Sequence, residues 1–333
     1  MRKSIKIAAL YLLVLLISFT LSGCANNDGS TEFEYEINDE LNGIVLTKYI
    51  GSDHDVVIPS KINRRPVVAL EGVFRDSGIT SVIIPEGVKI IGEYSFFTCD
   101  SLTSVTIPQS VTDIGDYAFF GTAIESITLP NNLANIGLGA FAANTALKSI
   151  TIPDGVTSLE EAFWGCTSLT SVSLPNSLTN LGRTTFYGCT SLVRITLPES
   201  LEYIGTGAFR ECTSLIEINI PVKVKTIDYA SFAECSSLKT VNIPEGVMHI
   251  EYAAFAECIS LEAITIPQSV VRIDDNAFFG CISLNTVVFR NNSVEIGNLA
   301  FLGSTALSDE TIEMILKLNP DSEFDIEFDI ELD

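Results

Sequence analysis

The chain has 333 residues, of which 42 are acidic and 19 basic, and its formal net charge at pH 7 is −23. Nucleic acids and anionic membranes bind proteins through basic surface, so this charge argues against both as partners. The acids are concentrated near the two ends, in residues 28–40 and 309–333, and leave the middle of the chain only mildly acidic.

The first 24 residues have the pattern of an export signal. Arg2, Lys3 and Lys6 give the start a positive charge, and the apolar run 7–19 follows. A membrane-spanning helix needs about 20 apolar residues, so this shorter run favours a secretory signal peptide over residues 1–23. An uncleaved anchor helix is the alternative.

The sequence Leu21-Ser22-Gly23-Cys24 ends this segment. It resembles the lipobox of bacterial lipoproteins, in which the cysteine thiol is lipidated and becomes the new N-terminus. The resemblance implies a lipid on Cys24 that anchors an extracytoplasmic chain at the cell surface, with no other membrane contact. Residues 24–40 are polar and acidic, which indicates a solvated tether.

Residues 41–307 are built from a unit of 22 or 23 residues. A period of 20 to 50 residues is typical of a solenoid, in which each coil packs only on its neighbours. An apolar residue precedes proline at one position of the unit: Ile84-Pro85, Ile107-Pro108, Leu129-Pro130, Ile152-Pro153, Leu174-Pro175, Leu197-Pro198, Ile220-Pro221, Ile243-Pro244 and Ile266-Pro267. A phenylalanine occupies another: Phe74, Phe96, Phe119, Phe141, Phe163, Phe186, Phe209, Phe232, Phe255, Phe278 and Phe301.

The copy at residues 191–213 shows what each part of the unit does. Ile195 and Leu197 are apolar with Thr196 between them, and this alternation predicts a short strand. Pro198 has no N–H to donate, which indicates where the strand leaves its sheet. Leu201 and Ile204 follow with a spacing of three residues, and a glycine or an acid comes next in every regular copy, which predicts a turn.

The first unit is longer than the others and contains Asn63-Arg64-Arg65-Pro66, which indicates a modified N-terminal coil. Terminal coils of a solenoid are atypical because one face has no neighbour to bury it. Some eleven coils with strands about 4.8 Å apart predict a rod or arc about 50 Å long.

The pattern Leu-x-x-Ile-x-Ile-Pro-x-x-Val-x-x-Ile-x-x-x-Ala-Phe-x-x-Cys-x-Ser resembles the BspA-like leucine-rich repeat family of bacterial surface proteins over about residues 44–307. The resemblance implies a single leucine-rich-repeat solenoid of short parallel β-strands and turns, with brief helical turns on its convex side. It also implies adhesion to host proteins or to other cells. Three copies are one residue short, and Arg290 replaces the proline of the last copy.

Residues 308–333 depart from the period. Ser308 can cap a helix with an acidic first turn, and Asn319-Pro320 would end it, which predicts a helical cap over the last coil. The tail from Glu323 to Asp333 alternates acidic and apolar residues. This alternation predicts a strand with one buried face, and a disordered acidic tail is the alternative.

Seven cysteines lie in the repeats, all at one position of the unit: Cys99, Cys166, Cys189, Cys212, Cys235, Cys258 and Cys281. Other copies place Ser77, Thr122, Asn144 or Ser304 there, so the position accepts small side chains that can form hydrogen bonds. Stacked Cβ atoms about 4.8 Å apart are also slightly too distant for disulfides. We expect a ladder of buried free thiols, and scattered disulfides or metal binding are the alternatives.

The two histidines, His54 and His249, lie at opposite ends of the array and cannot form one site. Asp53-His54-Asp55 has metal-ligand residue types, but its polar surroundings indicate a solvated turn. No phosphate-binding loop, metalloprotease helix or nucleophile elbow occurs in the sequence. We therefore predict no catalytic residue, metal or cofactor, and a protein that is not an enzyme. An enzyme with a site around His54 is the alternative.

Two surface features vary between copies. The outward strand position holds small polar residues, including Thr151 and Thr196, and predicts a neutral, hydroxyl-rich platform for a protein or glycan. Strand propensity alone is the alternative explanation. The residue after the repeat phenylalanine is often aromatic, as at Phe120, Trp164 and Tyr187. These side chains predict an interface stripe if they are exposed, and packing between coils otherwise.

Together these features predict a lipid-anchored adhesin at the cell surface. It would recognise a host or bacterial macromolecule through the extended face of its solenoid. A structural spacer or stalk on the cell surface is the alternative.

Overall fold

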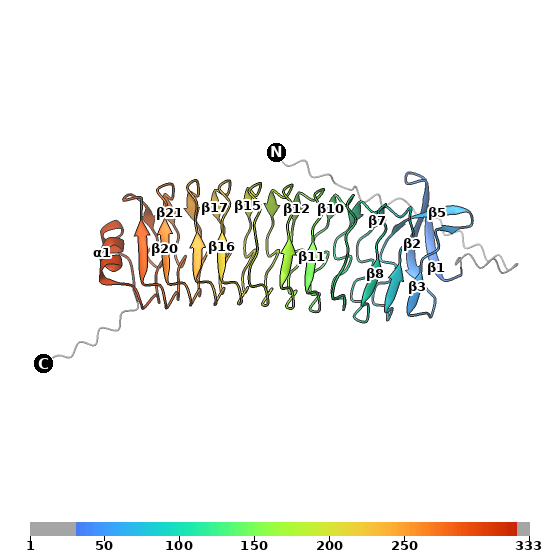
Figure 1. The fold of residues 1–333 in the computed structure, drawn as a ribbon, viewed down its shortest axis with the longest axis horizontal. Helices are drawn as coiled ribbons and strands as arrows, with labels where there is room; N and C mark the ends of the chain where they lie inside the picture. Colours follow the sequence, from blue (N-terminus) through green and yellow to red (C-terminus); the bar gives the residue numbers. More distant parts are fainter. Residues whose placement is uncertain (1–30, 325–333) are drawn as a thin grey trace.

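The computed structural model describes residues 31–324, which form one elongated solenoid of about eleven coils (Figure 1). The coils follow one another in chain order and end at helix α1 (Asp309–Leu318). The predicted leucine-rich-repeat solenoid with its C-terminal helix is therefore confirmed. The expected signal peptide and Cys24 lie outside the described residues.

Most coils contribute a strand to each of two ladders that run along the solenoid. The first ladder contains β3 (Asp55–Val57), β6 (Ser81–Ile83), β8 (Ser104–Thr106), β11 (Ser149–Thr151), β13 (Ser171–Ser173), β16 (Glu217–Asn219), β18 (Thr240–Asn242), β20 (Ala263–Ile266) and β22 (Thr286–Phe289). The second contains β2 (Gly43–Tyr49), β5 (Arg65–Leu70), β7 (Ile90–Ile91), β9 (Asp113–Ile114), β10 (Asn135–Ile136), β12 (Ser158–Leu159), β14 (Asn180–Leu181), β15 (Tyr203–Ile204), β17 (Thr226–Ile227), β19 (His249–Ile250), β21 (Arg272–Ile273) and β23 (Glu295–Ile296).

The first ladder forms where apolar and polar residues alternate in the sequence. In the parallel pair β11 and β13, Ser149 lies opposite Ser171 and Thr151 lies opposite Ser173. Ile150, between the two exposed residues of β11, is only 4% exposed because it points into the core. The strands confirm the prediction from the alternation in most copies, but residues 195–197, on which the unit was interpreted, form no regular strand, and the copy at 126–129 has only an isolated bridge at Ser126.

The second ladder was not expected from the sequence. Its regular strands are two residues long, and β14 and β15 place Leu181 opposite Ile204. Gly205 N donates to Leu181 O at 2.8 Å, so the bond that defines the strand comes from the neighbouring coil. A two-residue strand shows no alternation, and only stacking reveals it.

The segment that follows the second ladder is a run of turns. Arg210 N donates to Gly207 O and Cys212 N donates to Phe209 O, each at 3.1 Å. Between these, Phe209 N donates across the coil boundary to Ser231 O at 2.8 Å. The brief helical turns implied by the family resemblance are therefore single turns, and α1 is the only helix in residues 31–324.

The eleven repeat phenylalanines form one continuous column through the core. None is more than 2% exposed. Neighbouring ring centroids lie 4.9 to 5.9 Å apart, with planes within 18° of parallel. Rings at this distance stack favourably when offset, so the column joins every coil to the next.

The seven repeat cysteines are buried and free, which confirms the predicted thiol ladder. Each Sγ donates to the carbonyl of the phenylalanine in the preceding coil, at 2.9 to 3.2 Å. Ser304 makes the same bond to Phe278 O at 2.8 Å, which explains why serine can take the position. Burial raises the pKa of Cys166, Cys235 and Cys281 to about 12 and so opposes thiolate chemistry.

The N-terminal end corrects one expectation. The sequence predicts a solvated tether through residue 40, but Phe33–Asn38 form strand β1, which pairs antiparallel with β2. Phe33 is 3% exposed and packs on Phe74, the first ring of the column, at a centroid distance of 6.1 Å. A hairpin, made by β4 (Lys61–Ile62) and β5, supplies the extra residues of the first coil.

Helix α1 covers the other end of the core. Ser308 caps it as predicted, because its side chain accepts from Thr311 N, and Asn319 ends it. Ile315 is fully buried against the last coil. The predicted strand in the tail falls mainly on residues 325–333, which lie outside the described part of the chain.

Candidate binding surfaces

The outward side of the first ladder, here called the strand face, carries exposed polar side chains. Thr151 and Thr196 are both exposed there, as the predicted platform requires. A neighbouring row consists of serines on five successive coils: Ser81, Ser104, Ser126, Ser149 and Ser171. Their hydroxyl groups can each donate and accept, so the face offers hydrogen bonds without net charge.

The strand face is hollowed over residues 194–290. One hollow of about 580 Å³ and a second of about 460 Å³ share Asn219 and Asn242 in their linings. They therefore form one continuous depression, here called the trough, and Thr196 lines it. A third hollow of about 370 Å³ surrounds Thr151 farther along the same face.

Charged side chains of both signs line the trough: Arg194 and Arg290, and Glu199, Glu217 and Glu245. Arg194 Nε lies 3.1 Å from Glu217 Oε1, and both side chains are largely exposed. Arg290, which replaces a repeat proline, lies at the C-terminal end of the trough. Exposed ion pairs contribute little to stability, so these groups remain available to a partner.

A second surface lies in the turns that follow the second ladder. Six aromatic side chains, here called the aromatic row, line these turns: Tyr94, Phe97, Tyr117, Phe120, Trp164 and Tyr187. The structure brings Phe120 and Trp164 together, with centroids 6.4 Å apart, although a whole coil separates them. Trp164 is 40% exposed, whereas Phe120 and Tyr187 are half-buried.

Tyr187 lies at the C-terminal end of the aromatic row. Its hydroxyl donates to Glu211 Oε1 at 2.6 Å, and this bond, together with burial, raises the pKa of Tyr187. The guanidinium of Arg210 lies 5.8 Å from the Tyr187 ring. Part of Tyr187 is therefore used in packing between coils. Of the five predicted surface residues, Thr151 and Thr196 therefore lie on the strand face. The other three, Phe120, Trp164 and Tyr187, lie in the aromatic row.

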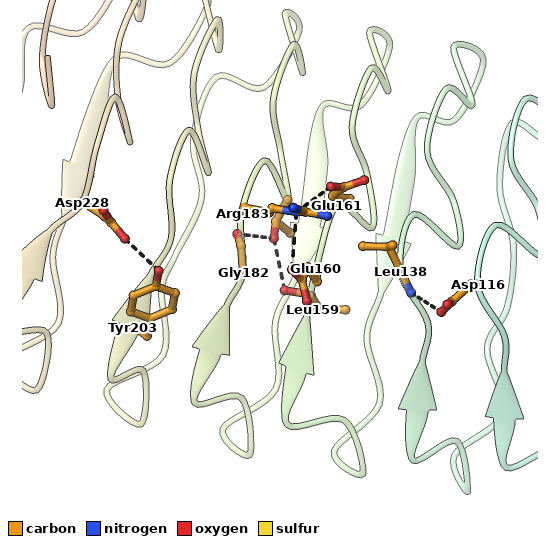
Figure 2. Close-up of polar contacts among 10 residues, drawn as sticks. Asp116, Leu138, Leu159, Glu160, Glu161, Gly182, Arg183, Tyr203 and Asp228 are labelled. Atoms are coloured by element: carbon orange, nitrogen blue, oxygen red, sulfur yellow. Dashed lines mark hydrogen bonds and ion pairs between the residues drawn. The ribbon is translucent and has the colours of Figure 1, made fainter. Parts of the chain in front are cut away.

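Acidic side chains border the aromatic row. Arg183 Nε lies 2.8 Å from Glu161 Oε1 and 3.5 Å from Glu160 Oε1 (Figure 2). Asp116, two coils away, accepts from Leu138 N at 2.7 Å (Figure 2). Farther along, the Tyr203 hydroxyl donates to Asp228 at 2.7 Å (Figure 2).

The Tyr94 and Tyr117 positions were missed by the sequence reasoning. They lie two residues before the repeat phenylalanine, at φ of 55° and 53°, and stack on each other with centroids 5.7 Å apart. The signal was available as a tyrosine with the same spacing in two successive copies, but this position varies too much to be recognised as a row.

His54 and its neighbours hold coils together. The His54 Nδ1 atom lies 2.7 Å from Gly78 O. Asp55 accepts from Thr80 at 2.8 Å and from Ser81 at 2.6 Å, and these bonds lower its pKa. Within residues 31–324, no group of three or more His, Cys, Asp or Glu residues is placed to hold a metal ion.

A stacked-coil solenoid with a polar strand face is the architecture of a leucine-rich-repeat protein. The chain belongs to the family described as BspA type leucine rich repeat region, whose model matches residues 70–162, 160–262 and 248–327. This membership indicates a role in protein interaction or at the surface of a cell. No curated protein matches the chain.

The chain is also similar to solved structures. A leucine rich cell surface protein from Faecalibacterium prausnitzii A2-165 is 27% identical with a TM-score of 0.57, over 92% of this chain and 100% of that one. A leucine-rich repeat protein from Bacteroides ovatus ATCC 8483 is 25% identical with a TM-score of 0.49, over 88% and 97%. In the part of this chain that the structure covers, no helix has the length and apolar character to cross a membrane.

Proposed function

We propose that this chain is a lipid-anchored bacterial surface protein that adheres to a protein or glycan through its strand face. The observation that carries the proposal is the trough, a continuous depression over residues 194–290 whose lining includes exposed amide and hydroxyl groups. Asn219 and Asn242 lie opposite each other in β16 and β18, so equivalent groups repeat at the strand spacing.

The chemistry of the trough supports an extended partner. Each amide or hydroxyl both donates and accepts, which suits a peptide backbone or a sugar. Threonine and asparagine side chains have few rotatable bonds, so ordering them on binding costs little entropy. A row of such groups on successive coils can contact a long ligand at many points.

The anchoring part of the proposal rests on the sequence ending in Cys24 and on the F. prausnitzii relative, which is a cell surface protein. Cys24→Ala should move the protein from the membrane fraction to the medium. Cys99→Ala is the control and should leave it in the membrane fraction. If neither variant were released into the medium, lipidation of Cys24 would be contradicted.

The binding test uses residues 25–333, because residues 31–324 share one hydrophobic core closed at both ends. Partner capture from host matrix, mucus and bacterial cells is compared for the unchanged chain and for Thr196→Arg/Asn242→Arg. A matched control, Thr157→Arg/Ser158→Arg, adds the same charge at exposed positions in and beside the second ladder.

We expect the trough variant to lose at least tenfold in affinity, about 1.4 kcal/mol, with an unchanged melting temperature. The control should bind like the unchanged chain. Equal binding by both variants would contradict the strand face as the binding surface. Absence of any capture by the unchanged chain would favour a spacer.

A further inference from the structure

Trp164 is the most exposed ring of the aromatic row, and it pairs with the half-buried ring of Phe120. The coil between them carries Ala142 at the equivalent position, and this small residue is fully buried. Gly121 N donates to Ala142 O, and Ala143 N donates to Trp164 O, so the three coils are adjacent. The two large rings therefore approach each other above a coil that has no large side chain at that position, and Trp164 stays 40% exposed.

Two arginine side chains of the chain itself contact rings at the two ends of the aromatic row. The guanidinium of Arg75 lies 5.2 Å from the centroid of Tyr94 and 5.3 Å from that of Phe97. At the other end, Arg210 lies over Tyr187 and is held at 2.7 Å by the Glu234 carboxylate. These are cation–π contacts, which favour arginine because its planar group stacks on rings.

Among the described residues, the central pair of rings, Phe120 and Trp164, has no such arginine over it. In residues 31–324, the cation–π contacts involve Tyr94, Phe97 and Tyr187, and none involves Phe120 or Trp164.

Carboxylates accompany the central pair. Glu161 opens the turn that contains Trp164, since Trp164 N donates to Glu161 O at 3.1 Å. Burial and the charges of Glu161 and Asp116 raise the pKa of Tyr117, whose ring lies 6.0 Å from that of Phe120. Glu160 adds a third acid, and its side chain is 54% exposed. The single guanidinium of Arg183 offsets only part of this charge.

We propose that the Phe120–Trp164 pair and its bordering carboxylates, Asp116, Glu160 and Glu161, form a docking surface for arginine side chains of a basic polypeptide. The exposed face of Trp164, beside Phe120, supplies the stacking surface and the carboxylates supply the charge complement, as Tyr187 and Glu234 do for Arg210. This surface is separate from the strand face, and it does not depend on the function proposed for that face.

Arg183 gives the proposal a directional test. Arg183 forms ion pairs with both Glu160 and Glu161, so it competes with an incoming guanidinium for the same carboxylates. Arg183→Gln should therefore strengthen binding about threefold, about 0.7 kcal/mol, while Glu160→Gln/Glu161→Gln should weaken it at least tenfold. A general attraction to an acidic protein would respond to any removed acid.

The chain contains one tryptophan, so Trp164 fluorescence reports on this surface alone. Residues 25–333 are titrated with hexa-arginine and with hexa-lysine, and emission is compared with total binding by calorimetry. We expect hexa-arginine to change the emission and to bind at least threefold more tightly than hexa-lysine. The control Glu262→Gln/Glu295→Gln removes two exposed acids elsewhere and should change the affinity less than twofold.

Three results would overturn the proposal. One is calorimetric binding of hexa-arginine without a change in Trp164 emission. The second is equal weakening by the Glu160/Glu161 and Glu262/Glu295 double variants. The third is equal affinity for hexa-lysine and hexa-arginine, since charge alone would then explain binding. Thermal unfolding of each variant checks that the solenoid is intact.

Discussion

The thiol of Cys212 donates a hydrogen bond to the backbone carbonyl of Phe186 in the preceding coil, with an Sγ–O distance of 3.2 Å. The same carbonyl accepts from Cys189 N at 3.1 Å within its own coil. One oxygen thus closes a turn and joins two coils. The cysteine at this position has a structural role that its sequence spacing alone does not reveal.

Replacing Cys212 tests this role. Cys212→Ala should lower the free energy of unfolding by about 1–2 kcal/mol, because it removes the bond and leaves a small cavity. Cys212→Ser should lose less, since Ser304 makes the equivalent bond to Phe278. Urea unfolding measures both. A serine variant less stable than the alanine variant would contradict the role of the bond.

Thiol counting tests the ladder as a whole. Residues 25–333 should show seven free thiols when unfolded without reductant, and none that reacts quickly when folded, because all seven are buried. Fewer thiols in the unfolded chain would mean that disulfides form between coils.

Replacing either of two glycines by alanine should lower the stability of the fold, for a different reason at each position. Gly188 has a φ of 69° with no close neighbour, so Gly188→Ala should cost about 1–2 kcal/mol through backbone strain alone. At Gly115, an added Cβ would lie 2.7 Å from Glu93 N in the adjacent coil. Gly115→Ala must therefore push two coils apart and should cost more. Urea midpoints rank the variants, and the reverse order would refute this account.

Glu71 should make stability depend on pH. Burial of its carboxylate against Gly92, and then the charge of Glu93, raise its pKa to about 7. Because the folded-state pKa is raised, the stability it contributes is complete below about pH 4.5 and is lost as pH rises through 7. Glu71→Gln should therefore be more stable than the unchanged chain at pH 8 and similar at pH 4.5, as measured by melting temperature.

A second variant separates the two causes of the raised pKa of Glu71, which are burial and the charge of Glu93. Glu93→Gln removes the neighbouring charge but keeps Glu71, so the folded-state pKa of Glu71 should be lower and the loss of stability with rising pH should end at a lower pH. Its melting temperature between pH 4.5 and 8 should fall less than that of the unchanged chain. An identical fall in both would mean that Glu93 does not act on Glu71.

Thr311 should be required at the C-terminal end. Its hydroxyl accepts from Val287 N and donates to Asn285 O, each at 3.3 Å, where the last coil has no following coil to bond. Thr311→Val should cost about 1–3 kcal/mol because the Val287 N–H loses its acceptor. Thr311→Ser keeps the hydroxyl and should cost less. Urea unfolding that shows equal losses would assign the effect to packing.

The sequence was sufficient for features that repeat within one unit. The strand around Ile150, the phenylalanine column and the capped helix at Ser308 each follow from residue type and spacing. Features that form only between two coils could not be predicted from residue type and spacing in this way. The second ladder at Leu181 and Ile204 consists of bonds between coils, and the approach of Phe120 to Trp164 depends on what the intervening coil lacks.

The error at the N-terminus has a different cause. Residues 33–38 alternate apolar and polar side chains as a strand should, but two glutamates among them gave the segment the composition of a tether. Phe33 is buried because it covers the open end of the phenylalanine column. The need for that cover is a property of the complete stack.

The thiol-to-carbonyl bond also bears on how such a chain changes in length during evolution. Residues 190–212 and 213–235 begin alike, with Thr-Ser-Leu after a cysteine, and they stack through the same contacts. Unequal recombination that removed residues 190–212 would join Cys189 to Thr213, and Cys235 would then meet Phe186 as it now meets Phe209. Each such event would shorten the solenoid by about 4.8 Å without creating a new type of interface. The length of the solenoid can therefore change in steps of one coil.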